Sequence, residues 1–193
     1  MSRITRSVLA LGASFAALAG GVTVAVADEP STPPAPSVAA AVPPSAVRLK
    51  AEHSGQCLTI TKASLRNGAD AVQSVCADDA ANQQFDMVAT GAGSFELRAK
   101  HSGKCLEVQS SGTKTGSVVQ QYWCGQGSHQ TWRLVMVDIA KELYELRPGH
   151  VTQTVNRCLD IASASKDDGA RSQLWACNGT AAQKWRIQPV TAA

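Results

Sequence analysis

Four residues near the C-terminus combine a carboxylate, two amides and an indole: Asp160, Gln173, Trp175 and Gln183. These groups suit a pyranose sugar, which presents C–H groups on one face and hydroxyl groups around its rim. An indole can remove the C–H face from water, and a carboxylate accepts hydroxyl protons in charge-assisted hydrogen bonds. The four residues therefore indicate a sugar-binding site, provided that the fold brings them together.

Similar residue types occur once more, earlier in the chain. This second set consists of Glu107, Gln120, Tyr122, His129 and Gln130. Its acid is one methylene longer than the first, which can misplace the carboxylate oxygens, while the imidazole can still form hydrogen bonds. The set is compatible with a second sugar site and equally with a solvated polar patch.

A third copy, nearest the N-terminus, lacks these groups. Thr59 takes the position of the acid, Val72 that of the amide and Ser74 that of the aromatic residue. Gln73 is displaced by one position, which would turn it to the opposite face of a strand. Asn82 remains, but a lone amide is not a site. We predict that this copy serves as scaffold.

A threefold repeat of cysteines defines the three copies. Each copy opens on Cys-Leu-x-Ile or Cys-Leu-x-Val, has a second cysteine 19 positions later and closes on Gln-x-aromatic. A period of roughly 50 residues indicates three supersecondary units that stack around one continuous core. Any function can therefore exist in up to three versions, which can be compared with one another.

The segment before the repeats has the features of an export signal. Arg3 and Arg6 precede a short apolar run, and Ala25 to Ala27 offer a small-x-small cleavage site. We predict a signal peptide over residues 1–27 and hence a secreted, extracellular protein. The alternative, a retained N-terminal anchor, is disfavoured because the apolar run is too short to span a membrane.

The remainder divides into a linker and one domain. Residues 28–45 are rich in Pro, Ala and Ser and predict an extended linker. Residues 46–190 have the length of a single domain. Its predicted repeats cover approximately residues 46–90, 91–138 and 139–190.

The charge of the chain argues against two classes of partner. The formal net charge is +3, and a signal peptide that carries two arginines and no acid leaves +1 after cleavage. A nearly neutral chain without a basic cluster lacks the electrostatic footprint of a nucleic-acid-binding protein. It also lacks a polybasic anchor for an anionic membrane. We expect no nucleic acid and no stable membrane anchor.

The cysteines favour disulfide bonds over a metal site. An exported protein with six cysteines generally uses them as disulfides, and the CxxC pairs of a zinc site are missing here. Of the possible pairings, the repeat selects the three local ones. The expected disulfides are Cys57–Cys76, Cys105–Cys124 and Cys158–Cys177.

Short alternating segments indicate the fold class. Apolar and polar residues alternate over 47–50, 95–98 and 144–147, just before each repeat reaches its first cysteine. Turn residues such as Ser-Gly and Asn-Gly separate such segments, and no stretch keeps a helical period. These patterns predict an all-β fold with about four strands in each repeat, closed so that no sheet edge is exposed.

The cysteine openings, the matched second cysteines and the three Gln-x-aromatic endings together resemble the ricin B-chain type (R-type) lectin family. The resemblance covers residues 46–189 and implies a β-trefoil with pseudo-threefold symmetry and carbohydrate-binding activity. It matches Asp160, Gln173, Trp175 and Gln183 to the family's binding positions and suggests galactose- or xylose-type sugars. Where the family usually has Asn before the last Gln, this chain has Ala182, which removes a hydrogen bond of about 1 kcal/mol.

Strand alternation predicts how the acid and the indole meet. If Cys158 and Cys177 lie opposite each other on antiparallel strands, Asp160 pairs directly with Trp175 and both point outward into solvent. Gln183 would then orient Asp160 from behind. Trp175 could instead be an ordinary packed aromatic residue, but an outward indole beside an acid is a poor core arrangement. The closing aromatics of the repeats are assigned to the core: Phe85, Trp132 and Trp185.

No catalytic residue, metal or cofactor is predicted. Glu107 and Asp160 belong to different repeats, so they should not flank one substrate as the acids of a glycosidase do. The sequence contains no Gly-x-Ser-x-Gly elbow. His53, His101 and His150 occupy equivalent positions and are interpreted as exposed loop residues. Two alternatives to a lectin-like protein stay open: a trefoil interaction module such as a protease inhibitor, and a binding subunit for a separately encoded glycosidase.

Overall fold

The computed structural model describes residues 46–152 and 154–190, so the predicted signal peptide and linker lie outside the described residues. Each repeat contributes four strands. The first repeat holds β1 (Ala46–Ala51), β2 (Cys57–Ile60), β3 (Ala69–Ser74) and β4 (Phe85–Gly91). The second holds β5 (Ser94–Ala99), β6 (Cys105–Val108), β7 (Val119–Tyr122) and β8 (Thr131–Asp138). The third holds β9 (Leu143–Pro148), β10 (Arg157–Ile161), β11 (Ser172–Ala176) and β12 (Trp185–Pro189).

Each repeat also has two short 3-10 helices, one after its second strand and one before its fourth. They are η1 (Thr61–Ala63), η2 (Ala81–Gln83), η3 (Gln109–Ser111), η4 (Ser128–Gln130), η5 (Ala162–Ala164) and η6 (Ala181–Gln183). Among the described residues, no helix has the length and apolar character needed to cross a membrane.

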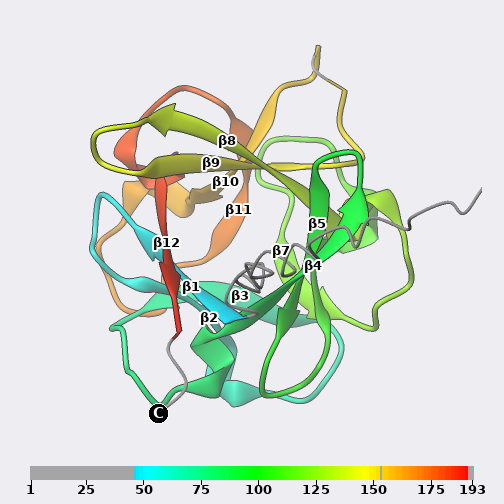
Figure 1. The fold of residues 1–193 in the computed structure, drawn as a ribbon, viewed down its shortest axis with the longest axis vertical. Coiled ribbons are helices and arrows are strands. Elements are labelled where there is room, and N and C mark those ends of the chain that lie inside the picture. Colours follow the sequence, from blue (N-terminus) through cyan, green and yellow to red (C-terminus); the bar gives the residue numbers. More distant parts are fainter. Residues whose placement is uncertain (1–45, 153, 191–193) are drawn as a thin grey trace, which may run out of the picture. The chain divides into compact units, whose positions relative to one another are not determined.

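Six strands close into a barrel (Figure 1). Antiparallel pairing runs from β1 to β4, β5, β8, β9 and β12, and β12 pairs again with β1. Closure leaves none of these six strands as an unpaired edge. The predicted all-β trefoil is therefore confirmed.

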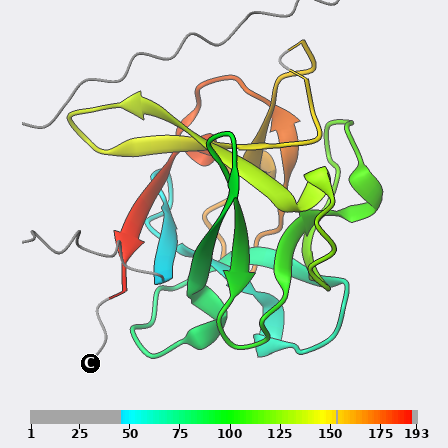
Figure 2. The same ribbon diagram turned by 45° about the vertical axis from the view of Figure 1, so that its right-hand side comes forward.

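The other six strands form three hairpins, one in each repeat (Figure 2): β2–β3, β6–β7 and β10–β11. Short pairings join these hairpins to one another. Asp70 pairs with Gln120, and isolated bridges link Val72 to Arg171 and Val118 to Gln173. The candidate site residues of all three repeats are carried by these hairpins and by the short helix that follows each one.

The closing aromatic residues form the centre of the core, as predicted. Phe85, Trp132 and Trp185 are fully buried among the apolar residues of all three repeats. The indole of Trp132 donates a hydrogen bond to the carbonyl oxygen of Leu106 (3.0 Å), and that of Trp185 to the carbonyl oxygen of Leu159 (3.2 Å). Each tryptophan thus fixes the backbone directly before the acid of its own repeat.

The three predicted disulfides are present, each with 5.1 Å between the Cα atoms. Every described cysteine is used in them. The carboxylates of Glu96 and Glu145 lie near two of the disulfides. Paired sulfurs are not thiolates, however, so these groups do not form metal sites.

The interpretation of the three equivalent histidines as exposed loop residues was wrong. Each is half-buried and places its Nε2 near a backbone carbonyl oxygen of a different repeat. The distances are 2.8 Å from His53 to Ser165, 3.0 Å from His101 to Ser64 and 2.9 Å from His150 to Gly112. The turns that carry them pack against a neighbouring repeat, so the histidines tie the repeats together.

Candidate functional site

The register of β10 and β11 differs from the prediction by two residues. Asp160 lies opposite Gln173, and Trp175 lies opposite Cys158. The predicted direct pairing of Asp160 with Trp175 was wrong because Cys177 follows the end of β11 and does not face Cys158. An even shift keeps side chains on the same face. Asp160 and Trp175 are therefore diagonal neighbours on one face of the hairpin.

The carboxylate of Asp160 is held by two amides. Gln173 Nε2 donates to Oδ1 (2.9 Å), and Gln183 Nε2 donates to Oδ2 (3.2 Å). The expected support from Gln183 is thus present. Asp160 does not point into open solvent as predicted, because only 5% of it is exposed. Burial raises the pKa of Asp160, and the two amides and the nearby charge of His53 offset part of this effect.

A hollow of about 340 Å³ opens above this carboxylate, and we call it the third hollow. It is lined by Asp160, Gln173 and Trp175 on the hairpin and by residues of the two flanking loops. Trp175 is 41% exposed, so its indole is not buried in the core. The hollow therefore offers an apolar ring beside a fixed, hydrogen-bonding acid, and its size is within the usual range for small-molecule sites.

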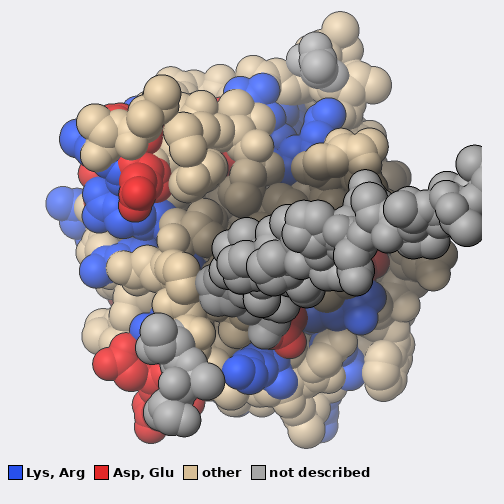
Figure 3. All heavy atoms as spheres, in the orientation of Figure 1, with Lys and Arg blue, Asp and Glu red and all other residues tan. Residues whose placement is uncertain are grey.

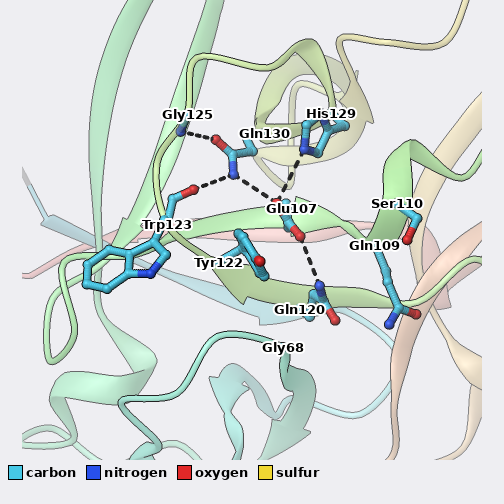
Figure 4. A pocket seen from close by; sticks show the side chains of 10 residues that line it. All are labelled: Gly68, Glu107, Gln109, Ser110, Gln120, Tyr122, Trp123, Gly125, His129 and Gln130. Carbon is cyan, nitrogen blue, oxygen red and sulfur yellow. Dashed lines mark hydrogen bonds and ion pairs between the residues drawn. The ribbon is translucent and has the colours of Figure 1, made fainter.

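The second repeat has a corresponding hollow, the second hollow, shown in Figure 4. Glu107 is buried, and its Oε1 accepts a hydrogen bond from Gln120 Nε2 (2.9 Å). Its Oε2 accepts from Gln130 Nε2 (2.8 Å) and lies 3.3 Å from His129 Nε2. All five residues predicted for this repeat line the hollow, with Tyr122 43% exposed at its surface.

The second hollow contains an aromatic residue that the sequence interpretation missed. Trp123 also lines it and is 65% exposed, and the volume is about 640 Å³. The sequence does distinguish Trp123 from its counterparts, because the other repeats have Val75 and Ala176 at the position before the second cysteine. Strict alternation assigns successive residues to opposite faces, so an aromatic residue next to Tyr122 was not considered.

The first repeat lacks these groups, as its sequence indicated. The hydroxyl of Thr59 donates to the carbonyl oxygen of Cys57 (2.8 Å), and Val72 is buried. Gln73 does point to the other side of the hairpin, where its Nε2 donates to the carbonyl oxygen of Ser165 (2.8 Å). Asn82 donates to the carbonyl oxygen of Ile60 (2.9 Å). These polar groups hold the scaffold together.

Comparison with known proteins decides the family. A family model described as "Ricin-type beta-trefoil lectin domain-like" matches residues 38–122, 82–155 and 128–193. The chain belongs to this family. No curated protein matches the sequence significantly.

Solved structures share the β-trefoil fold. The designed threefold-symmetric protein ThreeFoil is 35% identical, with a TM-score of 0.69 over 75% of this chain and 98% of its own. An exo-β-1,3-galactanase from Clostridium thermocellum is 27% identical, with a TM-score of 0.69 over 76% of this chain and 30% of its own. The Macrolepiota procera ricin B-like lectin, solved with lactose, is 16% identical, with a TM-score of 0.63 over 76% of this chain and 96% of its own.

Membership in the ricin-type family supports carbohydrate binding in general. The family is generally non-catalytic. The match to the galactanase, which is an enzyme, covers only 30% of that protein's length. The three disulfides and the fold are compatible with an extracellular protein. On the face shown in Figure 3, acidic and basic side chains of the described residues are interspersed, without a single basic field.

Proposed function

We propose that this protein is a secreted, non-catalytic lectin with its principal sugar site in the third hollow. Asp160 and Gln173 would bind hydroxyl groups, and Trp175 would cover the C–H face of the sugar. Gln183 would act behind them by orienting the carboxylate. The role of each residue follows from its exposure, since Trp175 is accessible and Gln183 is fully buried.

One observation carries this proposal: a nearly buried carboxylate has both oxygens oriented by amides beside a half-exposed indole. Each carboxylate oxygen has two acceptor positions. One amide on each oxygen leaves acceptor capacity for hydroxyl protons from a ligand. A structural acid would need neither the hollow nor the exposed ring.

The second hollow supports a second site of the same kind. Glu107 would accept hydroxyl protons, with Gln120, His129 and Gln130 holding it in place and Tyr122 as the platform. An exposed ring and a hollow favour a sugar site over a solvated polar patch. Two sites on one rigid domain would gain avidity on a polymer whose geometry lets both bind together.

Galactose- and xylose-type sugars are the first candidates. The resemblance to ricin-type lectins supports them, and one structural relative binds lactose according to its description. The galactanase match supports a second reading, since that enzyme carries a region like this chain within a much longer protein. The protein would then serve as a binding subunit for a separately encoded glycosidase, using the same two hollows.

A glycan array with wild type, Asp160→Ala and Trp175→Ala tests the proposal. We expect binding by wild type and a large loss in both variants, with residual binding through the intact second hollow. Val75→Ala is the matched control, because it truncates an exposed apolar residue of the first repeat. Flat arrays for all four proteins would contradict the lectin function and favour a protein-interaction module.

A further inference from the structure

Trp123 is exposed but firmly held. The Nζ atom of Lys104 lies 3.7 Å from the centroid of the indole ring, and only 6% of Lys104 is exposed. The lysine therefore backs one face of the ring in a cation–π contact. The backbone is fixed as well, because Gln130 Nε2 donates to the carbonyl oxygen of Trp123 (2.7 Å). The disulfide at Cys124 follows directly.

The trefoil itself does not require an aromatic residue at this position. The equivalent residues are Val75 in the first repeat and Ala176 in the third. With 65% of Trp123 exposed, its ring contributes little to the core. A rigid, exposed indole at the edge of a polar hollow provides a flat apolar platform, which suits the C–H face of a sugar.

The second hollow has room for more than the third. Its volume is about 640 Å³, compared with about 340 Å³. In Figure 4, the indole of Trp123 extends to one side of Tyr122, and the amide of Gln120 lies on the other side. Consecutive Cα atoms are only about 3.8 Å apart, so the two platforms are adjacent on one stretch of chain.

We infer that the second hollow binds an oligosaccharide, with one sugar unit on Tyr122 and the next unit on Trp123. This inference rests on the proposed lectin function. Glu107, held in place by Gln120, binds the hydroxyl groups of the first unit. Trp123 contributes only to ligands of two units or more, whereas the third hollow, with a single exposed ring, binds one unit.

Isothermal titration in a Trp175→Ala background isolates the second hollow. The ligands are galactose, β-1,3-galactobiose and β-1,3-galactotriose, with xylose, xylobiose and xylotriose as a second series. Adding Trp123→Ala should weaken binding of the disaccharide and trisaccharide about tenfold. Binding of the monosaccharide should change less than about twofold, because that sugar does not reach the second platform.

Two matched variants complete the design. Trp123→Phe keeps an aromatic face and should retain most of the affinity for oligosaccharides, while Val75→Ala should change nothing. Circular dichroism checks that each variant is folded, which is expected because both side chains are exposed.

The outcomes separate the inference from the function on which it rests. Trp123→Ala could weaken monosaccharide and oligosaccharide binding equally, or weaken neither. Either result would overturn Trp123 as a second platform. If Tyr122→Ala still abolished binding, the sugar site on Tyr122 would stand. Binding by wild type but none in the Trp175→Ala background would also overturn it and leave the lectin function standing. No binding by wild type to any glycan would reject both.

Discussion

The second and third hollows both hold their acid with two amides, but they differ in the residue before the last glutamine. Asp160 receives two amide hydrogen bonds, and the position before Gln183 is occupied by the methyl group of Ala182. Glu107 also receives two amides, and His129 at the position equivalent to Ala182 lies 3.3 Å from its carboxylate.

The contacts around Glu107 show how a longer acid is accommodated. The extra methylene of glutamate adds a rotatable bond, so the carboxylate needs more support to keep one orientation. An imidazole at the neighbouring position supplies a third contact. His129 therefore supports Glu107 in a way that Ala182 does not support Asp160.

The largest expected effect separates framework from binding surface within one repeat. Trp185→Ala should lower the free energy of unfolding by about 3–5 kcal/mol, because it removes a fully buried side chain. Trp175→Ala should lower it by less than about 1 kcal/mol, because the ring is at the surface. Urea denaturation measures both. Similar losses would mean that Trp175 is also part of the framework.

Exchanging the acids tests whether each hollow is matched to its own side chain. Asp160→Glu and Glu107→Asp should each weaken glycan binding by about 2 kcal/mol, because charge-assisted hydrogen bonds are lost or distorted. Titration calorimetry with the other hollow disabled by Trp175→Ala or Tyr122→Ala measures each site alone. Unchanged affinity after either exchange would show that acid length does not matter.

Acidification should weaken sugar binding in the third hollow. Burial raises the pKa of Asp160, so its carboxylate takes up a proton at a higher pH than an ordinary aspartate does. Sugar binding should weaken as the pH falls through this raised pKa, since the ionised acceptor is lost.

The same shift has the opposite sign for stability. The folded state binds this proton more tightly than the unfolded state, so protonation of Asp160 favours folding. Calorimetric titrations of Glu107→Ala across a pH series, with circular dichroism on the same samples, check this. In Asp160→Asn, the residual binding should lose this pH dependence, and an unaltered pH profile would contradict the assignment.

The smallest expected effect comes from restoring the missing amide. Ala182→Asn should strengthen sugar binding in the third hollow by about 1 kcal/mol, because it adds one hydrogen-bonding side chain at its edge. His129→Ala should weaken the second hollow by a similar amount. Glycan titration of both variants would show whether the third contact has the same value in the two repeats. A loss on Ala182→Asn would indicate that the position is too crowded.

Much of the architecture could be predicted because the repeats report on one another. The cysteine spacing, the closing aromatics and the alternation identified the disulfides, the core residues Phe85, Trp132 and Trp185, and the face shared by Asp160 and Trp175. The hydrogen bond from Gln183 to Asp160 also followed from this pattern. These features depend on local period and parity, which a sequence records directly.

Other features depend on three-dimensional context. The register of β10 and β11 was off by two because a disulfide does not require its cysteines to be cross-strand partners, and Cys177 lies beyond β11. The burial of Asp160 and the contacts of His53 are produced by segments distant in the sequence. Trp123 was missed because strict alternation places it on the face opposite Tyr122, whereas both side chains line the second hollow.

Side-chain NMR during a sugar titration measures directly whether the third hollow binds a sugar. The protein has four tryptophans, each with its own indole N–H signal. With lactose or xylotriose as ligand, the signals of Trp175 and of the Gln173 side-chain amide should shift with ligand concentration, while those of the buried Trp132 and Trp185 should not. A titration that leaves Trp175 and Gln173 unchanged while other signals shift would contradict a sugar site in the third hollow.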